Sequence, residues 1–195
     1  MSELREIESE SDLVAKALKL AALVSKLFAQ ENCELVVVGG SAVEFYTEGA
    51  YMSGDIDLCR TSMQRVPLRR AQDIMGRIGA KGGPRSWQVA GLFVDLLGFL
   101  ENESKSPLRI INTSLGPVKL IPPELVLVER ALQAYYPSAD EDAKSVAKKM
   151  LAVCLTGHTD VDWNEVDRLA CLPDFKIQKE IQELRQEVKD ELARK

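Results

Sequence analysis

The apolar residues near the start of the chain recur every three or four positions, which is the period of an amphipathic helix. Ser11, a favourable N-cap residue, comes just before them, so the pattern predicts a helix over residues 12–30. The apolar positions are Leu13, Ala17, Leu20, Val24, Leu27 and Phe28. Residues 35–38 then form a continuous apolar run that ends at Gly39 and Gly40, which is typical of a buried strand that enters a tight turn.

Short apolar or alternating runs, separated by Gly, Ser and Pro, continue this pattern and predict further strands. The predicted elements are a short helix from Ser41 to about Glu48, a strand at 55–58, a helix at 65–79 that Gly82-Gly83-Pro84 ends, two strands between Trp87 and Leu100 that meet near Gly91, and a strand from Val118 to Ile121. We expect these helices and strands to form one core of the α+β class.

From Pro122 onward the strand-like runs stop, and three or four helices are predicted instead. Pro123 suits a first helical turn, Asp140 suits a helix start, and Asp162 with Glu165 fits a capping box. The last helix places Ile177, Ile181, Leu184, Val188 and Leu192 on one face. We therefore expect a core with a mixed β-sheet flanked by helices at residues 1–121, and a C-terminal helical segment at residues 122–195 that packs on it.

Composition excludes several classes of protein. The chain has 195 residues, 46% of them hydrophobic, with 25 Lys and Arg against 30 Asp and Glu, so it is too apolar to be disordered and its net charge is −5. No apolar run is long enough to span a membrane, and the N-terminus is acidic rather than basic, so a cytoplasmic protein is expected. Four separated cysteines and one histidine, His158, favour neither a disulfide framework nor a zinc site.

The candidate chemistry lies on three of the predicted strands. The first strand ends at Gly39-Gly40-Ser41. Asp55 and Asp57, on the second strand, are two residues apart, so their side chains point to the same face. Asp95 lies in the third strand, which is otherwise apolar. Two carboxylates with phosphate oxygens and water are typical ligands of Mg²⁺, and a third carboxylate allows a second ion. An unpaired carboxylate would be costly in a buried strand, so metal binding explains Asp95, although an exposed strand face would explain it as well.

The turn at Gly39-Gly40-Ser41 adds a possible phosphate site. Glycines permit close approach to a phosphate, the amides at the start of the next helix point toward it, and Ser41 offers a hydroxyl donor. Together with the aspartates, this arrangement predicts a nucleoside triphosphate site and a nucleotidyl-transfer reaction. The alternative is a structural turn with carboxylates on an edge strand.

Two stretches, VVVGGSAVEFYTEGAYMSGDIDL and LFVDLLGF, carry a family resemblance. The first resembles the glycine turn and the Asp-x-Asp motif of the DNA polymerase β-like nucleotidyltransferase superfamily. Thirteen residues separate Ser41 from Asp55 in it. The second stretch contains Asp95, which resembles the third aspartate of that superfamily. The resemblance covers residues 30–121 and is to small bacterial members related to abortive-infection toxins and antibiotic nucleotidyltransferases.

The resemblance implies roles for these residues. Gly39, Gly40 and Ser41 would bind the triphosphate, Asp55 and Asp57 would bind metal, and Asp95 would complete the site and assist deprotonation of the acceptor hydroxyl. It also implies two Mg²⁺ ions, with an NTP such as ATP as donor. Arg130 stands about where small toxin-like members carry a lysine, and would contact phosphate in its place.

Basic residues concentrate between positions 60 and 85, where seven face the single acidic residue Asp73. They are Arg60, Arg65, Arg69, Arg70, Arg77, Lys81 and Arg85. Arg70, Arg77 and Lys81 are predicted to share a helical face, which could receive the triphosphate, an RNA or an acidic partner protein, or could simply be a solvated helix face. Tyr46 could stack on a base, or be a core aromatic residue.

Two functions therefore remain open. The first is a Mg²⁺-dependent transferase that moves a nucleoside monophosphate to a hydroxyl acceptor, such as a small molecule, a tRNA end or a protein. The second is an inactive nucleotide-binding or partner-binding module on the same fold, such as a toxin–antitoxin component. The sequence does not identify the acceptor.

Overall fold

The protein is described by a computed structural model that covers residues 2–101 and 104–194. Its chain forms two compact units. The sheet unit comprises Met1–Phe45, Met52–Glu101 and Leu108–Leu120, and the helical unit comprises Tyr46–Tyr51, Asn102–Pro107 and Ile121–Lys195. Two short segments from the first 121 residues thus belong to the helical unit.

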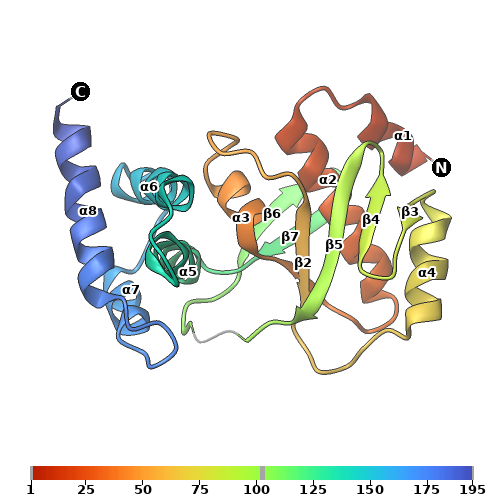
Figure 1. Cartoon of the computed structure of the whole chain (residues 1–195). Coiled ribbons are helices and arrows are strands. Elements are labelled where there is room, and N and C mark those ends of the chain that lie inside the picture. Colours follow the sequence, from red (N-terminus) through yellow and green to blue (C-terminus); the bar gives the residue numbers. More distant parts are fainter. Residues whose placement is uncertain (1, 102–103, 195) are drawn as a thin grey trace. The chain divides into compact units, whose positions relative to one another are not determined.

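The sheet unit is built on one mixed sheet with the strand order β3-β4-β5-β2-β1-β7-β6 (Figure 1). The strands are β1 (Leu35–Val37), β2 (Ile56–Arg60), β3 (Lys81–Gly82), β4 (Ser86–Val89), β5 (Leu92–Phe99), β6 (Arg109–Thr113) and β7 (Gly116–Leu120). β2 pairs parallel with β5, and β1 pairs parallel with β7, while the other pairs are antiparallel. The predicted α+β fold with a mixed sheet is confirmed.

Four helices belong to the sheet unit: α1 (Ser2–Ser9), α2 (Leu13–Ala29), α3 (Gly39–Tyr46) and α4 (Leu68–Arg77). α2 packs on β1 and β7 through its buried apolar face and runs behind the strands in Figure 1. Its N-cap is Asp12, not the predicted Ser11, because the Asp12 carboxylate accepts a hydrogen bond from the amide of Ala15.

The prediction that Arg70, Arg77 and Lys81 share one helical face is wrong for Lys81. α4 begins at Leu68, after Pro67, and Gly79 with φ +70° follows its end, so Lys81 lies in strand β3 instead of on the helix. Arg70 forms an ion pair with Glu31 at 2.5 Å and is therefore partly neutralised.

Two further elements, α1 and β6, were not expected from the sequence. α1 has only two large apolar residues, half-buried Leu4 and buried Ile7, and its Glu3 and Glu6 form ion pairs with lysines of α2. β6 is an edge strand with Ile110 58% exposed, so its sequence lacks the apolar alternation that marks a half-buried strand.

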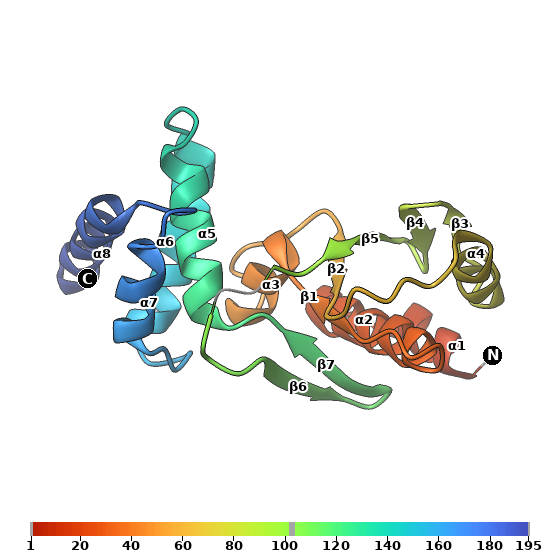
Figure 2. The same cartoon turned by 90° about the horizontal axis from the view of Figure 1, so that it is seen from below.

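The helical unit consists of α5 (Pro123–Tyr135), α6 (Glu141–Leu155), α7 (Trp163–Ala170) and α8 (Gln178–Ala193), with the two short segments (Figure 2). α5 packs against the other three helices, and its apolar side chains are almost entirely buried. Pro123 occupies the first turn of α5 and Asp140 caps α6, as predicted. Among the described residues, no helix combines the length and apolar character that crossing a membrane requires.

The predicted capping box of α7 is half correct. Asp162 accepts hydrogen bonds from the amides of Asn164 and Glu165, but the Glu165 side chain does not return to the Asp162 amide. That amide donates to the Oε1 of buried Glu124 at 2.8 Å, which ties α7 to the first turn of α5.

Glu165 serves a different purpose, because its carboxylate holds a segment distant in sequence. Its oxygens accept hydrogen bonds from Arg168 at 2.7 and 2.8 Å, from the Lys105 amide at 2.6 Å and from the Ser104 hydroxyl at 3.3 Å. These donors, Arg168 above all, lower the pKa of Glu165 from 4.5 to about 2.

Glu165 should therefore make folding dependent on pH. Its folded pKa lies below its unfolded value of 4.5, so its contribution is full above about pH 5 and is lost as pH falls toward 2. The shift corresponds to at most about 3 kcal/mol, since Arg168 remains partly exposed. We expect Glu165→Gln to lower the free energy of unfolding at pH 7 by up to this amount and to have little effect near pH 2, as measured by urea unfolding. An equal loss at both pH values would contradict the assignment.

Candidate active site

The pairing of β2 with β5 brings the three predicted aspartates together. Asp57 of β2 lies opposite Asp95 of β5 in the parallel register, and Asp55 immediately precedes β2. One carboxylate oxygen from each of the three lies within 4.8 Å of the others. Residues far apart in the sequence thus form one acidic cluster, which we call the aspartate triad.

The aspartate triad occupies the sheet face opposite α2. Leu58 and Leu96, each one residue beyond an aspartate of the pair, line a pocket together with Phe28 of α2. Because successive side chains of a strand point to opposite faces, Asp57 and Asp95 point away from α2. All three aspartates are half-buried and so remain accessible to a ligand.

The backbone of Gly39 lies directly beside the Asp57 carboxylate. It has φ +63°, and a Cβ atom at this position would lie 2.5 Å from Asp57 Oδ2, which is closer than atoms can approach. A residue without a side chain is therefore needed both for the backbone conformation and for the carboxylate. Gly40 follows it in the first turn of α3, which begins at Gly39 and not at the predicted Ser41.

Ser41 joins the turn to strand β2. Its hydroxyl donates to the Val38 carbonyl at 3.0 Å and accepts from the Asp57 amide at 3.0 Å, and its side chain is buried. The Val38 amide also donates to the Asp57 carbonyl at 3.0 Å. These bonds position Asp57, whereas a contact between Ser41 and phosphate stays a prediction.

Sequence reasoning missed Glu44, a buried carboxylate of α3. Its Oε2 accepts from the Ser53 amide at 2.7 Å, and the Ser53 hydroxyl donates to Asp55 Oδ1 at 3.2 Å, so Glu44 holds the loop that presents Asp55. Burial raises the pKa of the Glu44 carboxyl above its usual range. The available signal was a single acidic residue within the apolar stretch of this helix.

The environment of Asp95 differs from the expectation of a buried apolar strand. β5 lies between β4 and β2, so it is not an edge strand, yet only Val94 among its residues is fully buried. The cost of burying an unpaired carboxylate therefore explains little, and the proximity of Asp95 to Asp55 and Asp57 is the informative observation.

Three other predicted residues lie in the helical unit. Arg130 is part of α5, and its contact with phosphate stays a prediction. The Tyr46 hydroxyl donates to the Ile121 carbonyl at 2.7 Å. His158 is exposed, with its Nδ1 atom 2.8 Å from the Thr156 hydroxyl.

The aspartate triad fits a hard divalent cation. All of its ligand atoms are carboxylate oxygens. Two of the carboxylates lie on paired strands, and the third lies on a loop that Ser53 and Glu44 position. The three are close enough together to bind one ion or a close pair of ions. Among the described residues, no other group of three potential metal ligands comes together.

The fold agrees with that of known nucleotidyltransferase-like proteins. An antigenic nucleotidyltransferase-like protein from Paracoccidioides brasiliensis superposes with a TM-score of 0.52 at 15% identity, over 88% of this chain and 93% of that one. This chain has a nucleotidyltransferase-like fold. The fold expected from the resemblance is thereby confirmed, while an identity this low leaves the activity to be argued from the site.

Other similarities are weaker. The crystal structure of ANT(2″)-Ia in complex with adenylyl-2″-tobramycin superposes with a TM-score of 0.49 at 13% identity, over 90% of this chain and 98% of that one. A solution structure of ANT(2″)-Ia gives 0.43 at 14% identity, over 89% and 93%. Both scores are too low to support an argument. No protein-family model matches the sequence, and no curated protein matches it significantly.

Replacing Gly39 should damage the site more than replacing a nearby glycine. We expect Gly39→Ala to lower the free energy of unfolding by about 1–3 kcal/mol through the left-handed backbone, and to displace the Asp57 carboxylate. Gly54→Ala is the matched control, because its added Cβ would meet no atom within 4 Å. Urea unfolding measures the difference, and equal stability of the two variants would contradict this role of Gly39.

Ionisation of Glu44 should lower the free energy of unfolding as the pH rises. Its folded pKa lies above the usual 4.5, so ionised Glu44 costs stability above that pH and not below it. We expect Glu44→Gln, which keeps an acceptor for the Ser53 amide, to be more stable than wild type at pH 7 and equal to it near pH 4 in urea unfolding. Glu44→Ala should instead be less stable at both, because the Ser53 amide loses its acceptor. A Gln variant as unstable as the Ala variant would contradict this.

Proposed function

We propose that this chain is a metal-dependent nucleotidyltransferase that moves a nucleoside monophosphate from an NTP, such as ATP, to a hydroxyl acceptor with release of pyrophosphate. The observation that carries the proposal is the aspartate triad, in which Asp57 and Asp95 lie in register on the parallel strands β2 and β5, next to Gly39. The nucleotidyltransferase-like fold supports the same activity.

Asp55, Asp57 and Asp95 would hold one or two Mg²⁺ ions. Such ions, when bound, neutralise phosphate charge and polarise the phosphorus centre. Gly39 and Gly40 would allow the triphosphate to approach the start of α3, where backbone amides and the helix dipole favour anions. Ser41 would keep Asp57 in place through its amide, and Glu44 would do the same for Asp55 through Ser53.

The chemical step is an in-line substitution at the α-phosphorus. The acceptor oxygen forms the new P–O bond while the bond from the α-phosphorus to the bridging oxygen of pyrophosphate breaks. Asp95 lies on β5, opposite Asp57, and would take the proton of the acceptor hydroxyl, which makes the oxygen a better nucleophile. The acceptor itself is a small molecule, a tRNA end or a protein side chain.

Binding of NTP should depend on both Mg²⁺ and the aspartate triad. At 100 times its dissociation constant, a ligand stabilises the folded state by about 2.7 kcal/mol, which raises the melting temperature by a few degrees. We expect one of the four NTPs to do this with Mg²⁺ and not without it. Asp57→Asn should abolish the shift, because it removes a metal-binding charge while it keeps the amide that Ser41 binds.

The control is Asp73→Asn, which changes an exposed aspartate of α4 outside the aspartate triad and should leave the shift unchanged. Asp57→Asn without ligand should still unfold in one cooperative transition, because it keeps the backbone amide that Ser41 binds. Pyrophosphate release is then measured with pools of aminoglycosides, tRNA and protein. An NTP shift that survives Asp57→Asn would overturn the site, and NTP binding without pyrophosphate release would leave an inactive nucleotide-binding module.

A further inference from the structure

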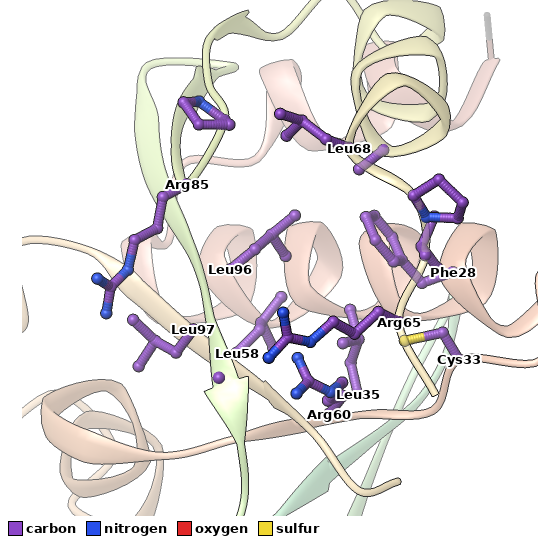
Figure 3. Close-up of a pocket in the computed structure, with 15 residues that line it drawn as sticks. Phe28, Cys33, Leu35, Leu58, Arg60, Arg65, Leu68, Arg85, Leu96 and Leu97 are labelled. Carbon is purple, nitrogen blue, oxygen red and sulfur yellow. The ribbon is translucent and has the colours of Figure 1, made fainter. Parts of the chain in front are cut away.

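The pocket that Leu58, Leu96 and Phe28 line lies in the sheet unit, on the face away from the aspartate triad. It has a volume of about 570 Å³, within the range typical of small-molecule sites. The C-terminal ends of β2 and β5, the end of α2 and the start of α4 surround it (Figure 3). Leu58 and Leu96 face it, while the neighbouring Asp57 and Asp95 point to the opposite face.

Three arginines of the basic cluster meet at this pocket. Arg60, Arg65 and Arg85 line it, and Figure 3 shows Arg60 and Arg65 reaching into the same part of it, with Arg85 beyond Leu96. No carboxylate lines the pocket, and none of the ion pairs among the described residues involves these arginines. Arg60 donates from Nε to the Ser62 carbonyl at 3.0 Å, which directs its guanidinium. The pocket thus carries three positive charges that its own side chains do not balance.

The floor and wall of the pocket are apolar. Phe28, Leu35 and Leu58 form a buried floor, and Val66, Pro67 and Leu68 contribute the wall. Leu68 is 53% exposed although it is a large apolar residue. Apolar surface next to unbalanced arginines fits a ligand that has both an anionic group and an apolar body.

Two backbone features shape this end of the pocket. The pairing of β2 with β5 shifts register between Leu58 and Arg60, so Leu96, Leu97 and Gly98, three consecutive residues, all line the pocket. α4 begins at the rim after Pro67, with no side chain capping its first amides, and so adds a weak attraction for anions.

We propose that this pocket binds a small amphiphilic anion, a molecule with a phosphate or carboxylate head and an apolar body. The guanidinium groups of Arg60 and Arg65 bind the head, because arginine presents paired N–H donors that match phosphate and carboxylate oxygens. The body lies on Phe28, Leu35 and Leu58, from which it displaces water.

A concave apolar floor favours such a molecule over a nucleic acid. A nucleic acid backbone would contact exposed cations along a surface, and would use Arg69 and Arg77, outside the pocket, as much as Arg65. The small amphiphile needs the arginines that line the pocket and is indifferent to Arg69. Arg69→Gln is therefore a matched control, since it removes the same charge from the same cluster.

The test is calorimetric titration of the full chain with decyl phosphate, decanoate and decyltrimethylammonium below their micelle-forming concentrations. We expect saturable binding of one or both anions at one per chain, and none of the cation. Arg60→Gln combined with Arg65→Gln should weaken binding at least tenfold, and Arg65→Gln alone should weaken it severalfold. Since Arg65 is exposed on a loop, its single variant tests the site even where the double variant folds poorly. The anion that binds more tightly, decyl phosphate or decanoate, identifies the preferred head group.

Binding should be independent of the aspartate triad, so Asp57→Asn should bind decyl phosphate like wild type and Arg69→Gln should do so within twofold. The absence of saturable binding by either anion would overturn the proposal, as would binding of the cation equal to that of the anions. Affinity for a short single-stranded RNA that Arg69→Gln lowers as much as Arg65→Gln would assign the basic cluster to nucleic acid instead.

Discussion

Parallel pairing of β2 with β5 is the constraint on which the candidate site depends. A hydrogen-bonded register sets Asp57 beside Asp95, and a slip of one residue would send one carboxylate to the α2 face. Apolar neighbours fix that register, since Ile56, Leu58 and Val94 must remain buried on the other face. Burial on one face thus determines where charge gathers on the other.

Helix α3 adds further contacts that position the aspartates. Gly39 leaves room for the Asp57 carboxylate, Ser41 holds the Asp57 amide, and Glu44 reaches through Ser53 to Asp55. These contacts act on Asp57 through its own backbone amide and on Asp55 through the Ser53 hydroxyl. The three carboxylates lie close enough to repel one another, and a bound cation would relieve this repulsion.

Hydrophobic periodicity predicted the parts of the fold whose sequence reflects burial, including α2, β1, the β4–β5 pair and the four C-terminal helices. It failed for β6 and α1, where exposed polar residues are held by edge pairing and by ion pairs that a local pattern does not reveal. Asp-x-Asp spacing predicted that Asp55 and Asp57 share a face, but the register that adds Asp95 is a tertiary property. The hydrogen bonds of Glu44 and Glu165 were likewise out of reach, because their partners lie in loops without regular spacing.

The shift of register between Leu58 and Arg60 divides one strand pair into two regions with separate tolerance to change. Before this shift, each residue of β2 pairs with one residue of β5. An insertion or deletion in this part of either strand would therefore misalign the carboxylates. Beyond it, the extra residue of β5 already interrupts the ladder, so the chain can lengthen, shorten or change side chains without disturbing the pairing upstream. The two ends of the strand pair can therefore diverge independently, so the end that carries Arg60 can vary while the end that carries Asp57 and Asp95 is held constant.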